Sequence, residues 1–270
     1  MIANTELQRV GLSGWRTGLA NLLRKENRTW WTLRRLLVQS ILWTVIIGGI
    51  VVITVRSTPR GAEITGDPQI LTLELATLGV TTLFGVAPLA LGIAAIVLLQ
   101  DAIIGERQLG VTEWLLSKPA SRSAYVLAKL LAHGLGTLVI LVGLQSALGY
   151  GLLWLLTGAL LPLPGYLVGV AGLAVHTLFY LALTLMMGVL TTKRGVVLGV
   201  SLGFLLIGSS AGKYMGMAFL YTPWGLGSLL SVPVFGASLP VPIGVSMGIT
   251  ALLAIIFVAV ALVRFERLEF

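Results

Sequence analysis

Residues that could carry out catalysis are few in this chain of 270 residues. The segment 208–212, GSSAG, matches G-x-S-x-G, the pattern that places a nucleophilic serine on a sharp turn. Such a serine needs a histidine base, usually placed after it in the chain order of hydrolases and rhomboid proteases. The two histidines, His133 and His176, both precede it, and 33 glycines make a chance match easy. We therefore predict no catalytic residue and a chain that is not an enzyme.

Metal and nucleotide sites are equally hard to build from these residues. The chain has no Cys, so thiolate zinc sites and iron–sulfur clusters are excluded. Met215 and Met217 could offer sulfur to copper(I), but no His or Cys stands near them, and gap-filling is the better interpretation. Gly212 and Lys213 lack the glycine spacing of a P-loop, so the chain itself should not hydrolyse ATP. We predict no bound metal and no bound cofactor.

The richest polar chemistry lies in one segment, DAIIGERQLGVTEWLLSKPASRSAYVLAK, which runs from Asp101 to Lys129. It alternates acid and base, and it carries a capping hydroxyl, an acid, a base, a helix-ending proline and a second capping hydroxyl at Thr112, Glu113, Lys118, Pro119 and Ser121. These signals predict a short helix between two long ones. Such a helix offers a surface to a soluble partner, although an ordinary ordered loop explains the same residues equally well.

Long apolar stretches must position this segment. Hydrophobic residues make up 57% of the chain and charged residues 10%, which excludes a soluble globular domain and a disordered chain. Stretches long enough to cross about 30 Å of hydrocarbon cover residues 36–55, 75–99, 127–156, 166–190, 196–211 and 243–263. We predict an all-α polytopic membrane protein with a leader, residues 1–35, and a six-helix transmembrane domain, residues 36–270.

The positions of the basic residues predict the orientation. Counted through alternate segments, fifteen of the 18 Lys and Arg residues fall on one side, whereas Arg56, Arg60 and Lys213 fall on the other. Loops rich in Lys and Arg stay in the cytoplasm, so both termini should be cytoplasmic. Because orientation already accounts for the net charge of +8, we predict no nucleic-acid partner.

Two further elements are predicted beside the spans. Apolar residues at helical spacing from Leu12 to Leu23, including Trp15 and Leu19, predict an amphipathic helix on the cytoplasmic face, with a solvated basic leader as the alternative. Trp30 and Trp31 should then mark the membrane interface. The segment 212–242 has one charge and four prolines, which indicates re-entrant helices; a malformed seventh span is the alternative.

Three polar positions within the apolar stretches are candidates for a transport pathway. His176 lies inside the fourth apolar stretch, where a lone histidine is either functional or hydrogen-bonded to a neighbouring helix. Lys129 and His133 lie one turn apart and either line an entry or reach toward the interface. Gly195, Gly199 and Gly203 share one face of the fifth stretch, which allows close approach of another helix.

The polar segment resembles the transmembrane subunits of type-two ABC exporters. The resemblance rests on the Arg24-Lys25-Glu26 patch and on an acidic–basic turn, a short helix, a Leu pair, a proline and a Ser-Arg pair, at Glu106, Arg107, Gly110, Thr112, Glu113, Leu115, Leu116, Pro119, Ser121 and Arg122. Val111 and Thr112 shift the family's usual Gly-Thr by one residue. Within the family, residues 101–103, Lys129, His133 and 239–242 are most similar to the permease serving nitrous oxide reductase maturation.

This resemblance implies a prokaryotic cytoplasmic-membrane permease that pairs with a second copy or a homologous permease. A separate ABC ATPase subunit, which holds ATP and Mg²⁺, would receive the coupling helix supplied by residues 101–126. Substrate would move outward along the dimer interface, in contact with membrane lipid, with an extracytoplasmic accessory protein as a further candidate partner. A permease-like signalling subunit without transport and a membrane-embedded lipid-modifying enzyme are the alternatives.

Overall fold

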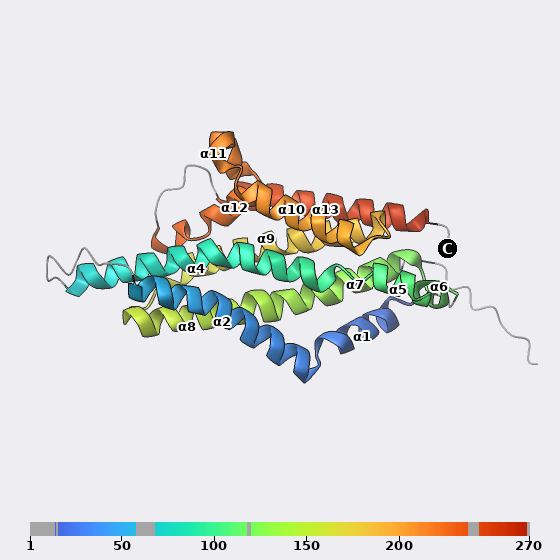
Figure 1. The fold of residues 1–270 in the computed structure, drawn as a ribbon, viewed down its shortest axis with the longest axis horizontal. Helices are drawn as coiled ribbons and strands as arrows, with labels where there is room; N and C mark the ends of the chain where they lie inside the picture. The colour runs from blue at the N-terminus through green and yellow to red at the C-terminus, as the bar shows by residue number, and fades with distance from the viewer. Residues whose placement is uncertain (1–13, 15, 58–67, 118–119, 237–242, 269–270) are drawn as a thin grey trace, which may run out of the picture.

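The computed structural model describes residues 14, 16–57, 68–117, 120–236 and 243–268. Its regular elements are all helical, and no strand occurs among these residues. Five helical stretches are long and apolar enough to cross a membrane, and a bent pair makes a sixth. The predicted all-α polytopic membrane fold is therefore confirmed. The stretches lie side by side as an elongated bundle (Figure 1).

The membrane-length helices extend several residues beyond the predicted stretches. They are α2 (Leu33–Ser57), α4 (Pro68–Leu99), α7 (Arg122–Gly136) continued by the π-helical η1 (Thr137–Leu144) and α8 (Gln145–Thr157), α9 (Leu163–Leu190) and α13 (Ile243–Glu266). The sixth is α10 (Arg194–Ser209), bent by 57° from α11 (Gly212–Met215) and η2 (Gly216–Tyr221). The 32 residues of α4 reach about 48 Å at 1.5 Å per residue, which exceeds the hydrocarbon thickness.

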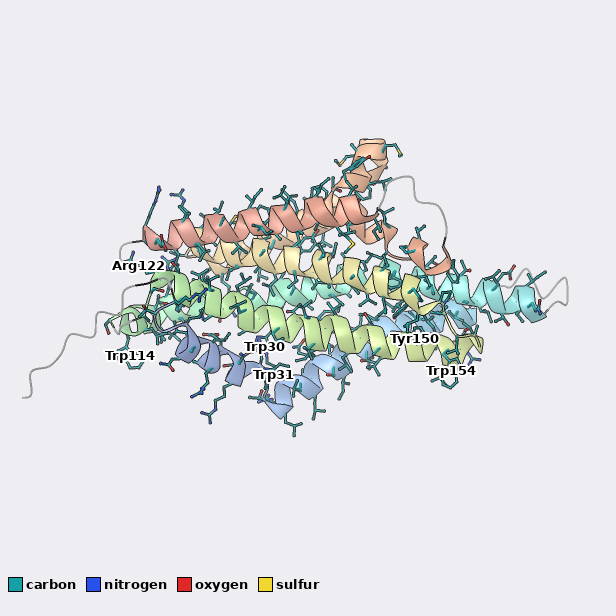
Figure 2. All side chains as sticks on the ribbon, turned by 180° about the vertical axis from the view of Figure 1, so that it is seen from behind. Trp30, Trp31, Trp114, Arg122, Tyr150 and Trp154 are labelled. Atoms are coloured by element: carbon teal, nitrogen blue, oxygen red, sulfur yellow. The ribbon has the colours of Figure 1, made fainter. Side chains whose placement is uncertain are left out.

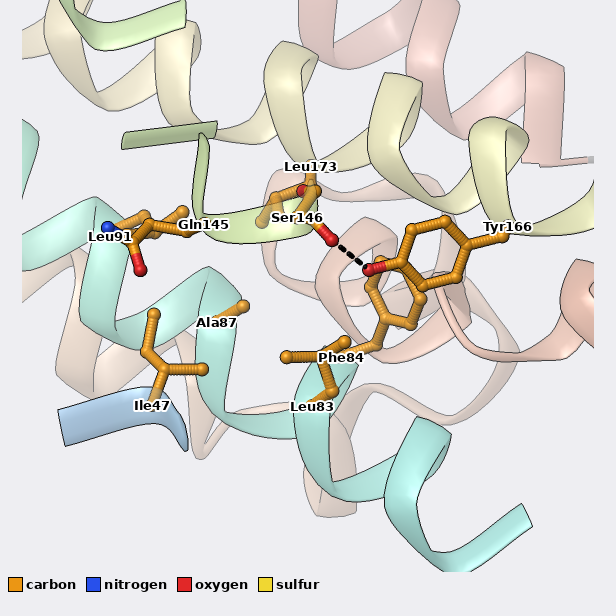
Figure 3. A pocket seen from close by; sticks show the side chains of 9 residues that line it. All are labelled: Ile47, Leu83, Phe84, Ala87, Leu91, Gln145, Ser146, Tyr166 and Leu173. Atoms are coloured by element: carbon orange, nitrogen blue, oxygen red, sulfur yellow. Dashed lines mark hydrogen bonds between the residues drawn. The ribbon is translucent and has the colours of Figure 1, made fainter. Parts of the chain in front are cut away.

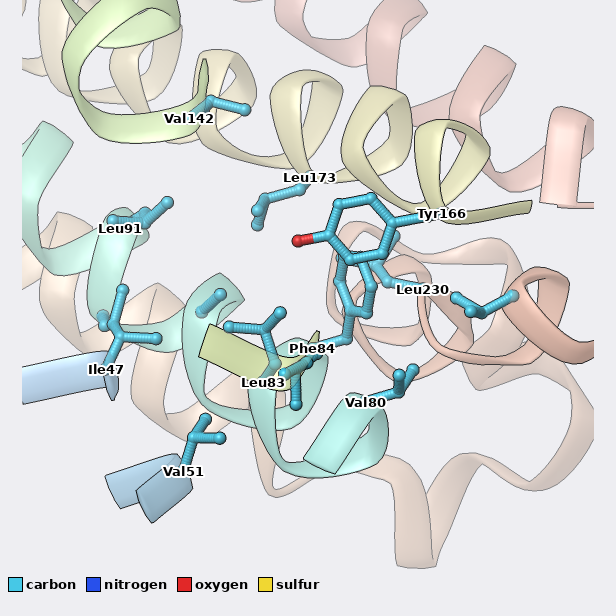
Figure 4. Packing of buried hydrophobic residues seen from close by; sticks show 14 of the residues in the cluster. Ile47, Val51, Val80, Leu83, Phe84, Leu91, Val142, Tyr166, Leu173 and Leu230 are labelled. Carbon is cyan, nitrogen blue, oxygen red and sulfur yellow. The ribbon is translucent and has the colours of Figure 1, made fainter. Parts of the chain in front are cut away.

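The core lies around α9, which packs against α13, α4 and α10. Most of α9 is buried, whereas only a small part of α2 and of α13 is fully buried, as expected for helices that face lipid. One buried cluster joins α2, α4, η1 and α9 through apolar side chains such as Val51, Leu83 and Leu173 (Figure 4). Beside it is a cavity of about 10 Å³, where the Tyr166 hydroxyl donates to the Ser146 carbonyl at 2.7 Å (Figure 3).

The leader helix differs from its prediction. It is α1 (Leu19–Trp30), which begins after Gly18 at φ +79° and shares only residues 19–23 with the predicted helix. Trp30 is buried rather than placed at a membrane interface, because its ring packs edge-on to His133. A Cβ on Gly136 would lie 2.3 Å from that ring. Helical periodicity identified an apolar face here without identifying α7 as the surface that covers it.

The segment before the last span forms short helices. After α11 and η2 come α12 (Pro223–Leu229) and η3 (Val232–Phe235). Gly165 and Gly169 on α9 allow the backbone of residues 230–234 to approach closely, because a Cβ at either would collide with it. Most of α12 is buried, so irregular backbone here is covered by protein. Its depth in a membrane stays a prediction, and residues 237–242 lie outside the described residues.

Candidate functional site

The polar segment forms two short helices at one end of the bundle. These are α5 (Ile104–Gln108) and α6 (Val111–Leu116), which lie between the end of α4 and the start of α7 (Figure 1). Gly110 joins them with φ +68°, a conformation that residues with a Cβ rarely adopt. Because α6 starts at Val111, Thr112 does not cap it, and that prediction is wrong. Ser121 caps α7 by accepting a bond from the Ala124 amide at 3.0 Å.

Two lysines and two glutamates from three helices form an ion cluster behind α5. Lys129 Nζ on α7 lies 2.9 Å from Glu106 Oε2 on α5 and 3.1 Å from Glu26 Oε1 on α1. Lys25 on α1 binds the other oxygen of Glu106 and lies 3.5 Å from Glu26. We call these four residues the ion cluster. It ties α1, α5 and α7 together with charge-assisted contacts, which are stronger than neutral hydrogen bonds.

The two lysines of the ion cluster differ in burial, and we therefore expect them to contribute differently to stability. The Lys129 side chain is only 2% exposed, whereas that of Lys25 is 43% exposed. An unpaired charge at the Lys129 position would be costly, and the two carboxylates compensate for it. Burial lowers the pKa of Lys25, but Glu106 and Glu26 outweigh it and raise that pKa above 10.5. The contribution of Lys25 to stability is thus full below pH 10.5 and is lost only as pH rises through the higher folded-state value.

Tyr125 extends the ion cluster toward α6 and the last helix. Its hydroxyl donates to Glu106 Oε2 at 2.7 Å and lies 3.3 Å from the Thr112 hydroxyl. Its ring stacks on Phe265 of α13, with centroids 5.2 Å apart and an interplanar angle of 13°. One residue thus connects α6, the ion cluster and the end of the last membrane helix.

Further polar contacts hold the same end of the bundle. Arg122 Nη1 donates to the carbonyls of Glu266 and Leu268, at 2.7 and 2.6 Å, and so caps the end of α13. Gln108 donates to the Thr192 carbonyl at 3.3 Å, and Asp101 pairs with Arg194 at 3.1 Å. The loop between α4 and α7 is therefore also anchored to the turn after α9 and to the start of α10.

In contrast, the tip of this loop is exposed. Leu109 is 79% exposed and Trp114 is 59% exposed, whereas Leu115 packs partly against the apolar cluster beneath. Trp114 lies at the extreme end of the molecule, far from Trp154 at the opposite end (Figure 2). Two large apolar side chains on a rigidly anchored loop make a surface suited to a protein partner.

Most residues singled out in the sequence meet at this end, with clear exceptions. Lys25, Glu26 and Glu106 join the ion cluster, whereas Arg24 and Arg107 do not belong to it. Pro119, Lys118 and Trp15 lie outside the described residues, as do the side chains of Glu113 and Leu116. Their roles stay predictions.

Sequence reasoning missed Tyr125 and the partners on α13. A signal for Tyr125 was available, because Ser121, Tyr125, Lys129, His133 and Thr137 follow one another at intervals of four. That spacing places a polar stripe on one face of a helix. No local pattern pointed to Ser123 or Glu266, which are hydrogen-bonded although 143 residues separate them.

The candidate pathway residues have different surroundings. Lys129 and His133 are buried between α1 and α7, so Lys129 does not extend to the interface as one alternative had it. His176 is also buried, within α9, and lines a cavity of about 260 Å³ together with Ser209. The Ser209 hydroxyl donates to the Leu206 carbonyl at 2.8 Å. A pathway role for the three residues stays a prediction.

Comparison with known families gives one match. Residues 20–270 match the family model described as ABC-2 family transporter protein. No curated protein matches the chain at a significant level. The family match covers every membrane-length helix and every residue of the ion cluster. The chain therefore belongs to the ABC-2 family of transporter proteins and is a membrane-spanning permease subunit of an ABC transporter.

Proposed function

We propose that the chain is the permease subunit of an ATP-driven exporter, which moves its substrate outward across the cytoplasmic membrane. The ABC-2 family implies an ABC ATPase partner in general. One observation carries the proposal: the ion cluster fixes the loop between α4 and α7 to α1 and α7, and α7 is in turn bonded to α13, yet the tip of the loop is exposed. A rigid, exposed tip can receive a force from a soluble subunit and pass it to membrane helices.

The transmission follows from the contacts. The ATPase would hold ATP and Mg²⁺, and closure of two ATPase subunits around ATP would displace the α5–α6 tip. Glu106 is bonded to Lys25, Lys129 and Tyr125, so α5 cannot move without α1 and α7. Coupling requires that the ATP-bound ATPase binds one conformation of the permease more tightly than the other. The ion cluster supplies the rigid connection through which that difference acts.

The charge distribution supports a cytoplasmic position for this end. Basic residues gather there, on α1, α5, α7, the turn after α9, the start of α10 and the end of α13; they include Lys25, Arg107, Arg122, Lys129, Lys193, Arg194 and Arg264. Basic loops remain in the cytoplasm. Both termini would accordingly be cytoplasmic.

An exposed face of α10 supports a second copy of the chain or a homologous permease as partner. A Cβ on Gly195, Gly199 or Gly203 would meet nothing within 4 Å, so the glycines face outward. Two of them line an apolar groove of about 660 Å³ with Ile207 and Trp224. Glycine faces allow membrane helices to pack closely, which favours a dimer through α10.

The test uses two exposed tryptophans at opposite ends of the molecule. Trp114→Ala removes apolar surface from the tip, and Trp154→Ala removes a comparable side chain, 50% exposed, from α8. Interface tryptophans often contribute about 2 kcal/mol or more to binding, which corresponds to at least tenfold in affinity. We expect Trp114→Ala to reduce co-purification of the co-expressed ATPase at least tenfold, with normal membrane yield. Trp154→Ala should retain it, and equal behaviour of the two variants would contradict ATPase docking at the tip.

Transport in vesicles separates export from signalling. Inside-out vesicles that contain the permease and its ATPase should accumulate substrate only with ATP if the chain exports. ATP hydrolysis that responds to the permease without accumulation would favour the signalling subunit instead.

We further propose, on the sequence resemblance alone, that the chain serves maturation of nitrous oxide reductase. Part of that resemblance, residues 239–242, lies outside the described residues. Deletion of the chain should then leave that reductase inactive in cells that make it, and wild-type chain should restore it. A fully active reductase in the deletion strain would contradict this assignment and leave the exporter proposal intact.

A further inference from the structure

A cavity of about 260 Å³ lies between α4, α9, α10 and α12, away from the ion cluster. Its floor is made of buried residues from all four helices: Pro88, His176, Tyr180, Leu205 and Gly227. His176 is 2% exposed and Tyr180 is fully buried, with ring centroids 5.0 Å apart. The cavity therefore reaches the interior of the bundle.

Two buried polar atoms at the floor, His176 Nδ1 and the Tyr180 hydroxyl oxygen, lack a hydrogen-bond partner within the part of the chain that the structure describes. The Nε2 of His176 faces Gly227, since a Cβ at that position would lie 3.5 Å from the nitrogen. Pro88 has no N–H, so the carbonyl of Phe84 loses its partner within α4. Buried polar groups in proteins are nearly always hydrogen-bonded, and an exception calls for an explanation.

The lining sets the chemistry of a ligand. Among the described residues no charged side chain lines the cavity, and most of its wall is apolar or aromatic. A neutral imidazole offers one donor and one acceptor. The matching ligand is uncharged, has an apolar body and carries one hydroxyl or amide group. The volume of the cavity suits a ligand with one alkyl chain or one ring system, because pockets of about 300 Å³ are at the small end of the range for small-molecule sites.

The mouth of the cavity faces a polar surface of α4. The mouth residues Gly85, Leu89, Ser209 and Ser228 are exposed. Glu74, Thr77 and Thr81 precede Gly85 at helical spacing, and all three are exposed on the same face. Polar residues on the outer face of a membrane helix are costly against lipid. The mouth of the cavity is therefore continuous with a polar stripe on the exposed face of α4.

We propose that this cavity binds an uncharged amphipathic molecule, which is held by a hydrogen bond to His176 and is the cargo of the transporter. The proposal of a binding site is argued from the cavity alone. The identification of its ligand as cargo rests on the proposed export function. Gly227 keeps open the space beside Nε2, because a Cβ there would also lie 3.2 Å from Pro88.

The test exploits the absence of Cys from the chain. Leu205→Cys places a thiol on the cavity floor, and Ser201→Cys places one a turn away on α10 at a fully buried position that does not line the cavity. The permease with its ATPase is embedded in lipid nanodiscs and treated with methyl methanethiosulfonate, which is small and uncharged. Mass spectrometry of the chain measures labelling. We expect Leu205→Cys to react at least tenfold faster than Ser201→Cys.

The chemistry that the cavity prefers is then measured by how strongly each probe slows labelling of the Leu205→Cys thiol. At equal membrane mole fraction, 1-decanol should slow labelling about threefold to tenfold more than decane, because one hydrogen bond separates them. Adding His176→Phe should remove that difference while retaining the ring contact with Tyr180. Decyltrimethylammonium should protect no better than decane.

Several results would overturn the proposal. They are equal labelling of the two thiols, equal protection by alcohol and alkane, or better protection by the cation. If Leu205→Cys does not fold, Ser209→Cys at the mouth serves the same comparison. Labelling needs no ATP, so its failure would leave the exporter proposal standing. Conversely, failure of the Trp114→Ala test would leave the binding site standing and remove only its identification with cargo.

Discussion

Two buried polar groups of this molecule, one at the end that carries the ion cluster and one inside the bundle, have opposite surroundings. At one end Lys129 is buried and fully matched, with two carboxylates within 3.1 Å. Deeper in the bundle, His176 is equally buried, and its Nδ1 has no hydrogen-bond partner among the residues that the structure describes. A satisfied buried charge rigidifies the segments that it joins, whereas an unsatisfied neutral group can accept a ligand. The contrast separates a region built to transmit force from one built to bind.

We expect the largest loss of stability when Lys129, the buried cation of the ion cluster, is removed. Lys129→Met leaves Glu26 and Glu106 partly buried with only the more exposed Lys25 to pair with them, and loss of one partner of a buried pair costs about 3 to 5 kcal/mol. We expect a clear fall in the midpoint of thermal unfolding of the purified chain. Lys193→Met, at an exposed position in the turn after α9, should change stability by no more than about 0.5 kcal/mol. Equal effects of the two variants would show that the ion cluster does not stabilise this end.

A substitution that disturbs the packing of α1 against α7 should cause an intermediate loss of stability. Gly136→Ala places a Cβ 2.3 Å from the buried Trp30 ring, and overpacking of this kind costs about 1 to 3 kcal/mol. Gly49→Ala on α2 meets nothing within 4 Å and should be neutral or stabilising. Thermal unfolding of both variants measures the difference, and a harmless Gly136→Ala would show that α1 is not held tightly on α7.

The smallest effect is expected at the exposed edge of the ion cluster. Lys25→Gln removes a cation whose side chain is 43% exposed, and such pairs contribute about 0 to 1 kcal/mol. Its effect on unfolding should shrink at 1 M salt, because exposed pairs are screened. If Lys25→Gln lost as much stability as Lys129→Met, burial would not explain how much each lysine contributes.

Much of the fold could be predicted from hydropathy, and little of the packing could. Six apolar stretches gave the membrane helices because length and polarity suffice to identify a span. The position of Trp30 was wrong because a tryptophan near a span is typical of an interface, and only the tertiary contact with Gly136 reveals that it is buried.

For the site, the sequence indicated the right segment but not its partners. Glu106 and Lys25 were named from motif resemblance, yet their pairing spans 81 residues and follows no local rule. Thr112 was assigned to a cap from its spacing alone, whereas its hydroxyl lies beside Tyr125 in a buried contact. Charge complementarity across distant helices depends on the fold, which periodicity does not determine.

Contact between the α5–α6 tip and an ATPase can be tested by site-specific photocrosslinking. A benzophenone amino acid replaces Trp114 in one variant and Trp154 in the other, since both side chains are exposed and lie at opposite ends. Each variant is co-expressed with the ATPase and irradiated in membranes. We predict a crosslink to the ATPase from position 114 and none from position 154. A crosslink from position 154, or from neither position in a complex that still hydrolyses ATP, would contradict docking of the ATPase at the α5–α6 tip.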